Sequence, residues 1–236
     1  KTNSDGSITD PVMYYMDFRF SNLCNLGHKT CGSPLSSTLA NWRADKNELR
    51  FLKDKNVLSD RGTITSFVYA RPDFLEVDVF PHIKDVKGFY FAGGEPLMHP
   101  MHHEMLEVLK PYAQNITLEY STNLHYLNNV LEHWPLYKRV ICRVSVDSDP
   151  STYEYLREGG NLEKLVENWN TIKTQMATQI ENKQLDLHAT CTVNVLNAVK
   201  IDEVLKFWTE LDSRLHVSFV QYPGVMDICN LPDNLK

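Results

Sequence analysis

The sequence predicts an α/β fold built on a parallel sheet, and three observations support this. Strand-like segments rich in aromatic and β-branched residues alternate with segments of helical apolar periodicity along the 236 residues. The connections are long enough to hold helices as right-handed crossovers between parallel strands. Apolar residues make up 42% of the chain and charged residues 23%, which is typical of a globular domain with a sizeable core. Either an open doubly wound sheet or a partial barrel satisfies this pattern.

Each expected element has its own local signal. The strands are expected at residues 12–20, 86–91, 116–122, 140–146, 185–195 and 215–221, where aromatic and β-branched residues are enriched. One helical face is shared by Met101, Met105, Leu106, Leu109 and Tyr112. Further helices are expected at residues 126–134, 162–172 and 201–211, and their tryptophans are expected in the core. In both candidate architectures the chemistry lies at the carboxyl ends of the strands.

The chain divides into a core and two tails. We expect an N-terminal tail at residues 1–11, a core at 12–223 and a C-terminal tail at 224–236 that could begin a further extension. Within the core, residues 33–85 form a long insertion that should contain one or two helices.

Charge, hydropathy and cysteine content limit the function and compartment. The net charge of −6 argues against a nucleic-acid or membrane-surface partner, because both favour a basic face. No apolar run reaches the ~18 residues of a membrane span, and the first residues lack a signal-peptide core. Five cysteines are an odd number for a disulfide framework, which favours a reducing, cytoplasmic compartment. Cys142 and Cys191 lie in strand-like runs and are expected to be small buried hydrophobes.

The loop after the first strand carries candidate metal ligands. Cys24, His28 and Cys31 follow one another at spacings of four and three residues. Thiolate and imidazole groups suit zinc or an iron–sulfur cluster. Structural zinc normally takes four protein ligands, and this loop offers three, which would leave one metal position open. The alternative is two unrelated free thiols and a surface histidine.

A second motif follows the second strand. Gly93 and Gly94 allow a sharp turn or a close backbone approach, and Glu95 then stands at the strand end, where its carboxylate could bind an ammonium group. The alternative is an ordinary turn from a strand to a helix.

Together, the two motifs resemble those of the radical S-adenosylmethionine superfamily, whose signature is CxxxCxxC. The matching stretch runs from Cys24 to Gly32, with His28 at the place of the second cysteine, and Gly93-Gly94-Glu95-Pro96 is similar to the second motif. Members with a twitch or SPASM-type extension are the most similar. The resemblance covers about residues 15–222 and implies a partial (β/α)6 TIM-like barrel.

The resemblance implies a cofactor set and a reaction. In that family three cysteines hold a [4Fe-4S] cluster, and S-adenosylmethionine chelates the fourth iron. Its reductive cleavage gives a 5′-deoxyadenosyl radical, which abstracts hydrogen from the substrate. By resemblance, the metal ligands and catalytic residues are Cys24, His28 and Cys31. A peptide or small-molecule substrate and an electron donor such as flavodoxin or ferredoxin are implied as partners.

The resemblance also implies a binding site for S-adenosylmethionine. Gly93, Gly94 and Glu95 would meet the methionine amino group, Ser145 a ribose hydroxyl, and Arg157 the methionine carboxylate. The other implied cofactor-binding residues are Thr30, Thr122, Asn123, Asp147, Asn194 and Gln221. The turn at Thr122-Asn123-Leu124 is similar to the family's TNG-like turn, with leucine in place of glycine.

His28 is the main departure from the family pattern. A neutral imidazole in place of a thiolate makes a cluster less negative, and therefore easier to reduce and a weaker reductant. His28 can ligate and support altered chemistry, or ligate poorly. The site can also have lost its cluster, which leaves an S-adenosylmethionine-binding protein with a regulatory or scaffold role. A zinc-dependent protein is a third alternative.

Overall fold

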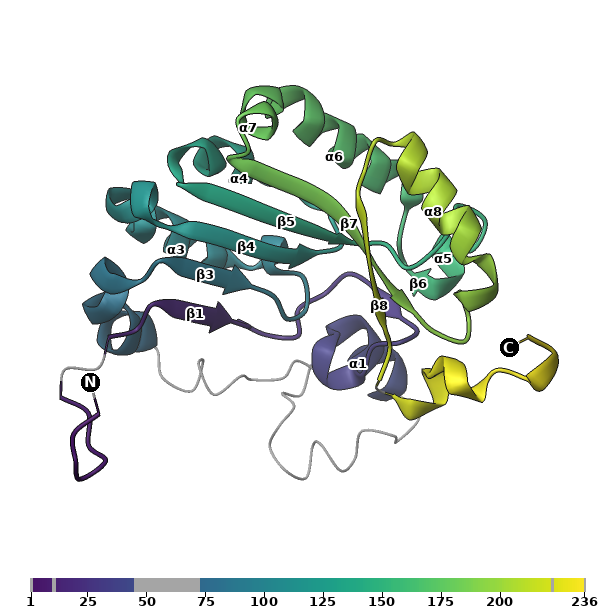
Figure 1. Cartoon of the computed structure of the whole chain (residues 1–236), viewed down its shortest axis with the longest axis horizontal. Coiled ribbons are helices and arrows are strands. Elements are labelled where there is room, and N and C mark those ends of the chain that lie inside the picture. The colour runs from purple at the N-terminus through teal and green to yellow at the C-terminus, as the bar shows by residue number, and fades with distance from the viewer. Residues whose placement is uncertain (1, 10–11, 45–72, 222, 236) are drawn as a thin grey trace.

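The computed structural model describes residues 2–9, 12–44, 73–221 and 223–235. Its centre is a six-stranded sheet in the order β1-β3-β4-β5-β7-β8, and every neighbouring pair is parallel (Figure 1). The strands are β1 (Tyr15–Phe18), β3 (Gly88–Phe91), β4 (Thr117–Thr122), β5 (Arg139–Ser145), β7 (Leu185–Val193) and β8 (Leu215–Phe219). The α/β class and all six predicted strands are therefore confirmed.

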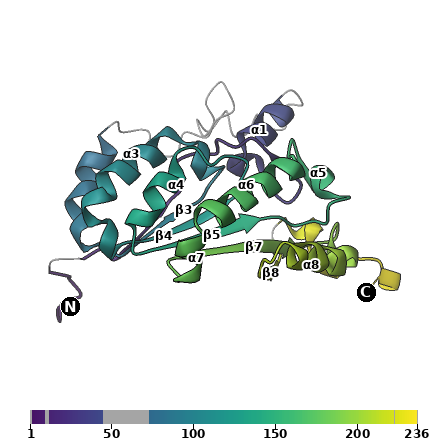
Figure 2. The same cartoon turned by 90° about the horizontal axis from the view of Figure 1, so that it is seen from above.

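Helices α3 (Pro100–Leu109), α4 (Val130–His133) and α6 (Leu162–Gln175) lie on one side of this sheet, as Figure 2 shows. The other α-helices of the described residues are α1 (Ser37–Ala44), α5 (Tyr153–Leu156), α7 (Ala177–Glu181) and α8 (Ile201–Glu210). Short 3-10 segments flank several of them, including one at Lys110–Asn115 directly after α3. Within the described ranges, no helix is both long and apolar enough to cross a membrane.

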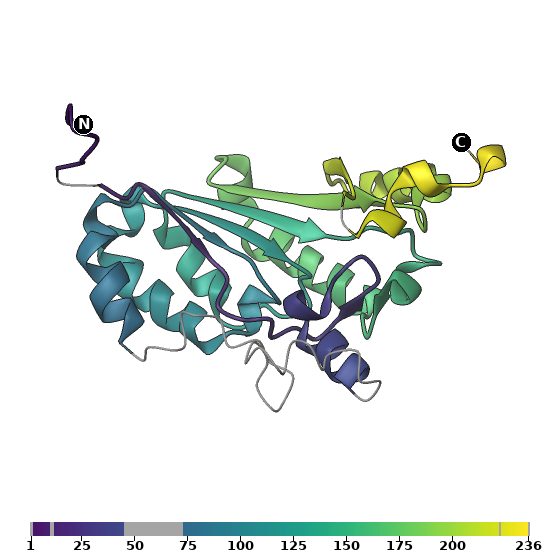
Figure 3. The ribbon, with the colours of Figure 1, turned by 90° about the horizontal axis from the view of Figure 1, so that it is seen from below.

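The two faces of the sheet differ sharply in chemistry. Along β4 and β5, Leu118, Tyr120, Val140 and Cys142 are fully or almost fully buried against the helices. Successive side chains of a strand point to opposite faces, so the residues that alternate with them, among them Glu119, Arg139 and Arg143, lie on the other face. Arg143 Nη2, for example, donates to Glu119 Oε2 at 2.7 Å. An apolar face under helices and an opposite face that carries charged residues fit a partial TIM-like barrel. Figure 3 shows the ribbon of the same sheet from below.

The core contains most of the residues that the sequence placed there, and Tyr112 and Leu205 are exposed exceptions. Trp134, Trp169 and Trp208 are at most 1% exposed, and the rings of Trp169 on α6 and Trp208 on α8 meet edge to face at 5.4 Å. Cys142 and Cys191 are fully buried, as predicted. Tyr112 is 40% exposed, because α3 ends at Leu109 and the tighter 3-10 turn after it rotates the ring off the apolar face.

The predicted insertion at residues 33–85 is described only at its two ends. Its first part forms a 3-10 turn at Ser33–Leu35 and then α1. Its last part is a π-helix at Leu75–Val79 that continues into a 3-10 helix at Phe80–Asp85. Leu75, Val79 and Ile83 from this last part are buried in the core. The rest of the predicted insertion, residues 45–72, lies outside the described residues.

The tryptophan contact between α6 and α8 gives a test of the packing. We expect Trp208→Ala to reduce the free energy of unfolding by about 3–5 kcal/mol, because it opens a cavity beneath α8. Phe219→Ala on β8 is the control, since Phe219 is 61% exposed and its loss should change stability by less than ~0.5 kcal/mol. Urea denaturation measures both values, and equal losses would contradict the assignment of Trp208 to the core.

Candidate functional site

A cavity of about 240 Å³ lies at the carboxyl ends of the strands. Most of the predicted site residues line it, and these are Cys24, His28, Cys31, Gly93, Gly94, Thr122, Asn123, Ser145 and Arg157. The structure therefore brings the cysteine loop and the glycine turn together at one place. Thr30, Glu95, Asp147, Asn194 and Gln221 do not line the cavity.

The cysteine loop is held in place by hydroxyl groups at the start of α1. The hydroxyl of Thr38 donates to the carbonyl of Cys24 at 2.7 Å, and the hydroxyl of Ser36 donates to the carbonyl of Leu26 at 2.6 Å. The backbone N–H of Cys24 donates to Ser37 Oγ at 3.1 Å. These bonds satisfy backbone groups of the loop that no regular strand or helix pairs. The loop can therefore keep a fixed conformation in which Cys24 and Cys31 line the cavity.

A short antiparallel pairing ties the same loop to the chain after α5. Strand β2 (Gly27–His28) pairs with β6 (Arg157–Glu158), which sets His28 opposite Arg157. Lys29 extends the contact, because its N–H donates to Leu156 O at 2.9 Å and its ammonium lies 2.8 Å from Glu158. Sequence analysis missed this pairing, since two-residue strands leave no periodic signal.

The glycine turn packs directly on the cysteine loop. Gly93 and Gly94 have φ values of +78° and +58°, which L-residues with a side chain rarely adopt. A Cβ on Gly94 would lie 2.3 Å from the carbonyl oxygen of Leu23, so only glycine allows this approach. The N–H of Glu95 then donates to that same carbonyl at 2.7 Å.

The sequence predicted that the carboxylate of Glu95 could bind an ammonium group, and in the structure this carboxylate is bonded to groups of the protein itself. Its carboxylate is 1% exposed and accepts hydrogen bonds from Leu97 N–H, the Thr122 hydroxyl and Asn123 N–H at 3.1, 2.7 and 2.6 Å. Burial raises the pKa of Glu95 to about 7, against the opposing effect of these three bonds. Glu95 therefore joins the turn after β3 to the end of β4, and it lies behind the cavity wall.

The end of β4 contains a strained turn. Leu124 is fully buried and has a φ of +58°, which costs a residue with a side chain roughly 1–2 kcal/mol. A glycine would adopt this conformation freely, which explains why leucine is an unusual residue in this turn. The turn is held by Asn123, whose side-chain amide donates to Asn25 Oδ1 at 2.8 Å in the cysteine loop.

Asp147 is the buried centre of the site. Its Oδ2 lies 2.5 Å from Arg157 Nη2 and 2.9 Å from His28 Nε2, and its Oδ1 accepts from Thr192 N–H at 2.6 Å. Although burial acts in the opposite direction, Arg157 and His28 hold the pKa of Asp147 well below its usual value. Burial and the nearby Arg157 lower the pKa of His28, while Asp147 raises it.

The donor set fits an iron–sulfur cluster better than a single metal ion. In the described parts of the chain, no three His, Cys, Asp or Glu side chains converge on one possible ion position. A cluster does not need this convergence, because each protein ligand binds a different iron. Burial raises the pKa of Cys24 to about 11 and also raises that of Cys31, so both thiols need a metal cation to become thiolates. Two such thiols and an imidazole around one cavity are a suitable donor set.

The remaining predicted residues have structural contacts. Thr30 Oγ lies 3.2 Å from both ring nitrogens of His28. Asn194 is fully buried and closes the turn after β7, where it accepts from Leu196 N–H at 2.9 Å. Gln221 is exposed beyond the end of β8.

Two further polar side chains of the cavity were not predicted from the sequence. Arg19 and Tyr90 line it from the ends of β1 and β3, and the guanidinium lies 5.9 Å from the centre of the tyrosine ring. Tyr90 Oη is hydrogen-bonded to Ser121 Oγ at 2.8 Å. The rule that chemistry lies at strand ends could have selected Arg19, which directly follows β1.

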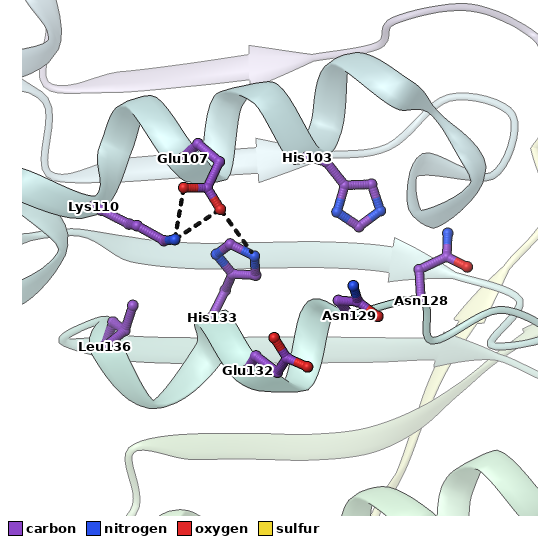
Figure 4. Close-up of a pocket in the computed structure, with 8 residues that line it drawn as sticks. All are labelled: His103, Glu107, Lys110, Asn128, Asn129, Glu132, His133 and Leu136. Carbon is purple, nitrogen blue, oxygen red and sulfur yellow. Dashed lines mark hydrogen bonds and ion pairs between the residues drawn. The ribbon is translucent and has the colours of Figure 1, made fainter.

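A larger cavity of about 660 Å³ lies away from the strand ends, between α3 and α4. Figure 4 shows His103 and Glu107 from α3, and Lys110 directly after it, facing His133 from α4 across the cavity. Lys110 Nζ donates to both oxygens of Glu107, at 2.7 and 2.6 Å, and His133 Nε2 lies 3.5 Å from the same carboxylate. Glu107 is thus already neutralised by the protein.

Comparison with solved structures shows the fold of radical S-adenosylmethionine enzymes. The chain is similar to native anSMEcpe with bound AdoMet at a TM-score of 0.61 and 18% identity, over 89% of this chain and 52% of that one. It is similar to Streptococcus suis SuiB bound to precursor peptide SuiA at a TM-score of 0.54 and 14% identity, over 94% of this chain and 43% of that one. The chain thus spans about half the length of these structures. No protein-family model and no curated sequence matches it.

The close approach at Gly94 gives a test of the site's construction. We expect Gly94→Ala to reduce the free energy of unfolding by at least ~1–3 kcal/mol, because the new Cβ meets a carbonyl oxygen and the backbone keeps a positive φ. The matched control is Gly224→Ala, since a Cβ there meets nothing within 4 Å. Denaturant unfolding compares them, and similar stability of the two variants would contradict the docking of the turn on the loop.

Glu95 gives a pH-dependent test. Its pKa is about 7 in the folded protein and roughly 4.3 in an unfolded chain, so the folded state binds the proton more tightly. Its contribution to stability is therefore complete below about pH 4.3 and is lost as the pH rises towards 7. We expect the stability of the wild type relative to Glu95→Gln to fall across this range. Urea titrations at several pH values measure the free energy of unfolding of both proteins. If the difference between the two does not change with pH, Glu95 does not titrate in this range.

Proposed function

We propose that this chain is the core of a radical S-adenosylmethionine enzyme that acts on a peptide or a small molecule. The observation that carries the proposal is the meeting of Cys24, His28 and Cys31 with the Gly93-Gly94 turn and Arg157 around one cavity. The fold shared with radical S-adenosylmethionine enzymes supports it. When bound, a [4Fe-4S] cluster would supply the electron that cleaves the sulfonium to give a 5′-deoxyadenosyl radical for hydrogen abstraction.

The chain's own residues have complementary tasks around the cofactor. Cys24, His28 and Cys31 would hold the cluster. Arg157 lines the cavity and still has N–H groups beyond those that bond Asp147 and the carbonyl of Val146, so it can pair with the methionine carboxylate.

The glycine turn and two strand ends would complete the cofactor contacts. Gly93 and Gly94 present uncovered backbone to the cavity, where carbonyl oxygens can accept from the methionine ammonium. Ser145 and Asn123 offer polar groups for the ribose.

A peptide is the substrate class that the comparisons favour. SuiB was solved with the precursor peptide SuiA, and anSMEcpe with AdoMet and a Cp18Cys peptide, to which this chain is similar at a TM-score of 0.57 and 16% identity over 89% of its length. The polar sheet face could contact such a peptide through Arg143, Asp186 and Arg214, which line a cavity of about 440 Å³. An electron donor such as flavodoxin or ferredoxin would be required, in a reducing cytoplasm that keeps the five free cysteines as thiols.

The second candidate function is a cluster-free S-adenosylmethionine-binding protein with a regulatory or scaffold role. The observation that favours it is the contact of His28 with Asp147, since the protein already satisfies one ring nitrogen. A zinc site is less favoured, because no three candidate side chains in the described ranges converge on one ion.

Anaerobic reconstitution with iron and sulfide tests the proposal. We expect a brown protein that releases 5′-deoxyadenosine when dithionite and S-adenosylmethionine are added, as measured by chromatography. A colourless protein that still binds S-adenosylmethionine would support the cluster-free alternative, and one zinc per chain after oxygen-free purification would support the zinc site.

A substitution at residue 28 sharpens this test. We expect His28→Cys to raise the fraction of protein that carries the cluster, because a thiolate binds iron more strongly than a neutral imidazole and adds a negative charge. Cys24→Ser should remove the cluster. Cys229→Ser is the matched control, because Cys229 is exposed and outside the cavity. Iron content is the readout, and no change in His28→Cys would contradict the assignment of residue 28.

A further inference from the structure

The two ring nitrogens of His28 have different surroundings. Nε2 lies 2.9 Å from Asp147 Oδ2, and the two side chains are only 15% and 3% exposed. The same carboxylate is ion-paired with Arg157, so its oxygen acts as an acceptor, and Nε2 must carry the proton of this contact. The Thr30 hydroxyl lies 3.2 Å from each ring nitrogen, and this group can rotate to donate or accept.

Asp147 has no freedom to turn towards the cavity. Its Oδ1 accepts from Thr192 N–H at 2.6 Å, its carbonyl accepts from the side-chain amide of Asn197 at 2.7 Å, and its backbone has a φ of +54°. These contacts hold the carboxylate behind the imidazole, because β7 and the turn after it fix both ends of the residue. The carboxylate is thus a rigid support for one edge of the His28 ring.

We propose that Asp147 is a positioning residue that makes Nδ1 of His28 the nitrogen that binds iron. This inference rests on the proposed function, because it requires that residue 28 is a cluster ligand. The proton on Nε2 leaves the lone pair on Nδ1. Histidines that bind metals commonly donate their second N–H to a carboxylate, which fixes the tautomer and increases the basicity of the ligand.

The arrangement also compensates for the missing thiolate. A cysteine would bring a negative charge to the metal, whereas a neutral imidazole brings none. A carboxylate on the far nitrogen makes the ring a stronger donor, although Arg157 offsets part of the negative charge of Asp147. His28 and Asp147 together would therefore replace part of what the second cysteine supplies.

Isotopic labelling of the wild-type protein tests the choice of nitrogen. Two samples are prepared with histidine that carries ¹⁵N only at Nδ1 or only at Nε2, and each is reconstituted with iron and sulfide and reduced. We expect electron–nuclear double resonance to detect a directly bonded ¹⁵N in the Nδ1 sample alone. A directly bonded signal from Nε2, or from neither sample, would overturn the inference.

Variants test the role of Asp147. We expect Asp147→Asn to weaken retention of cluster iron against a chelator by about 10–100-fold, as is typical when the carboxylate behind a metal-bound histidine is lost. In the His28→Cys background the same change should weaken retention by a clearly smaller factor, because only the loss of the Arg157 contact remains. Asp186→Asn is the matched control, because Asp186 also contacts a histidine, with His188 Nδ1 at 3.0 Å, but does not line the cavity that contains Cys24 and Cys31.

The outcomes separate this inference from the proposed function. If neither the wild type nor His28→Cys assembles a cluster, the proposed function fails and the inference fails with it. If clusters assemble and Asp147→Asn acts equally in both backgrounds, or no more than Asp186→Asn does, only the inference is overturned. If Asp147→Asn does not fold, as circular dichroism would show, the labelled wild-type samples decide.

Discussion

The buried carboxylate of Asp147 is the interaction on which the site depends. It joins the cysteine loop through His28, the segment after α5 through Arg157, and β7 through Thr192. A buried ion pair adds little net stability when it forms, but removal of one partner typically costs about 3–5 kcal/mol, because the other charge is left uncompensated. The buried carboxylate therefore contributes more to the choice of one conformation than to net stability. The three segments that carry His28, Arg157 and Thr192 must meet at Asp147 for these groups to be paired.

Much of the fold could be predicted from the sequence, because its signals are periodic. All six strands and the apolar faces of α3, α6 and α8 follow from alternation and helical spacing. Parallel strands place their carboxyl ends at one edge, so Cys24 and Gly93 could be predicted to come together, whereas Ser145 and Arg157 were added by the family resemblance. The β2–β6 pairing could not, since it rests on two residues in each strand.

The orientation of individual polar side chains was beyond the sequence for a different reason. Glu95 and Asp147 stand at strand ends, where carboxylates often face a ligand, yet each is bound by groups from other segments and lies behind the cavity. Their partners, such as Asn123 and Thr192, come from strands whose register only the tertiary structure fixes. Arg19 and Tyr90 were missed because each lies within a run that is also explained by strand formation alone.

The two outer strands of the sheet, β1 and β8, form its rims. In the part of the chain that the structure describes, β1 pairs only with β3, and β8 only with β7. Each rim therefore offers backbone donors and acceptors to an extended segment, and the exposed aromatic rings of Tyr15 and Phe219 stand beside them. An open sheet of this kind can add one more strand at a rim. An incoming extended segment would then be held by backbone hydrogen bonds, independently of its side chains.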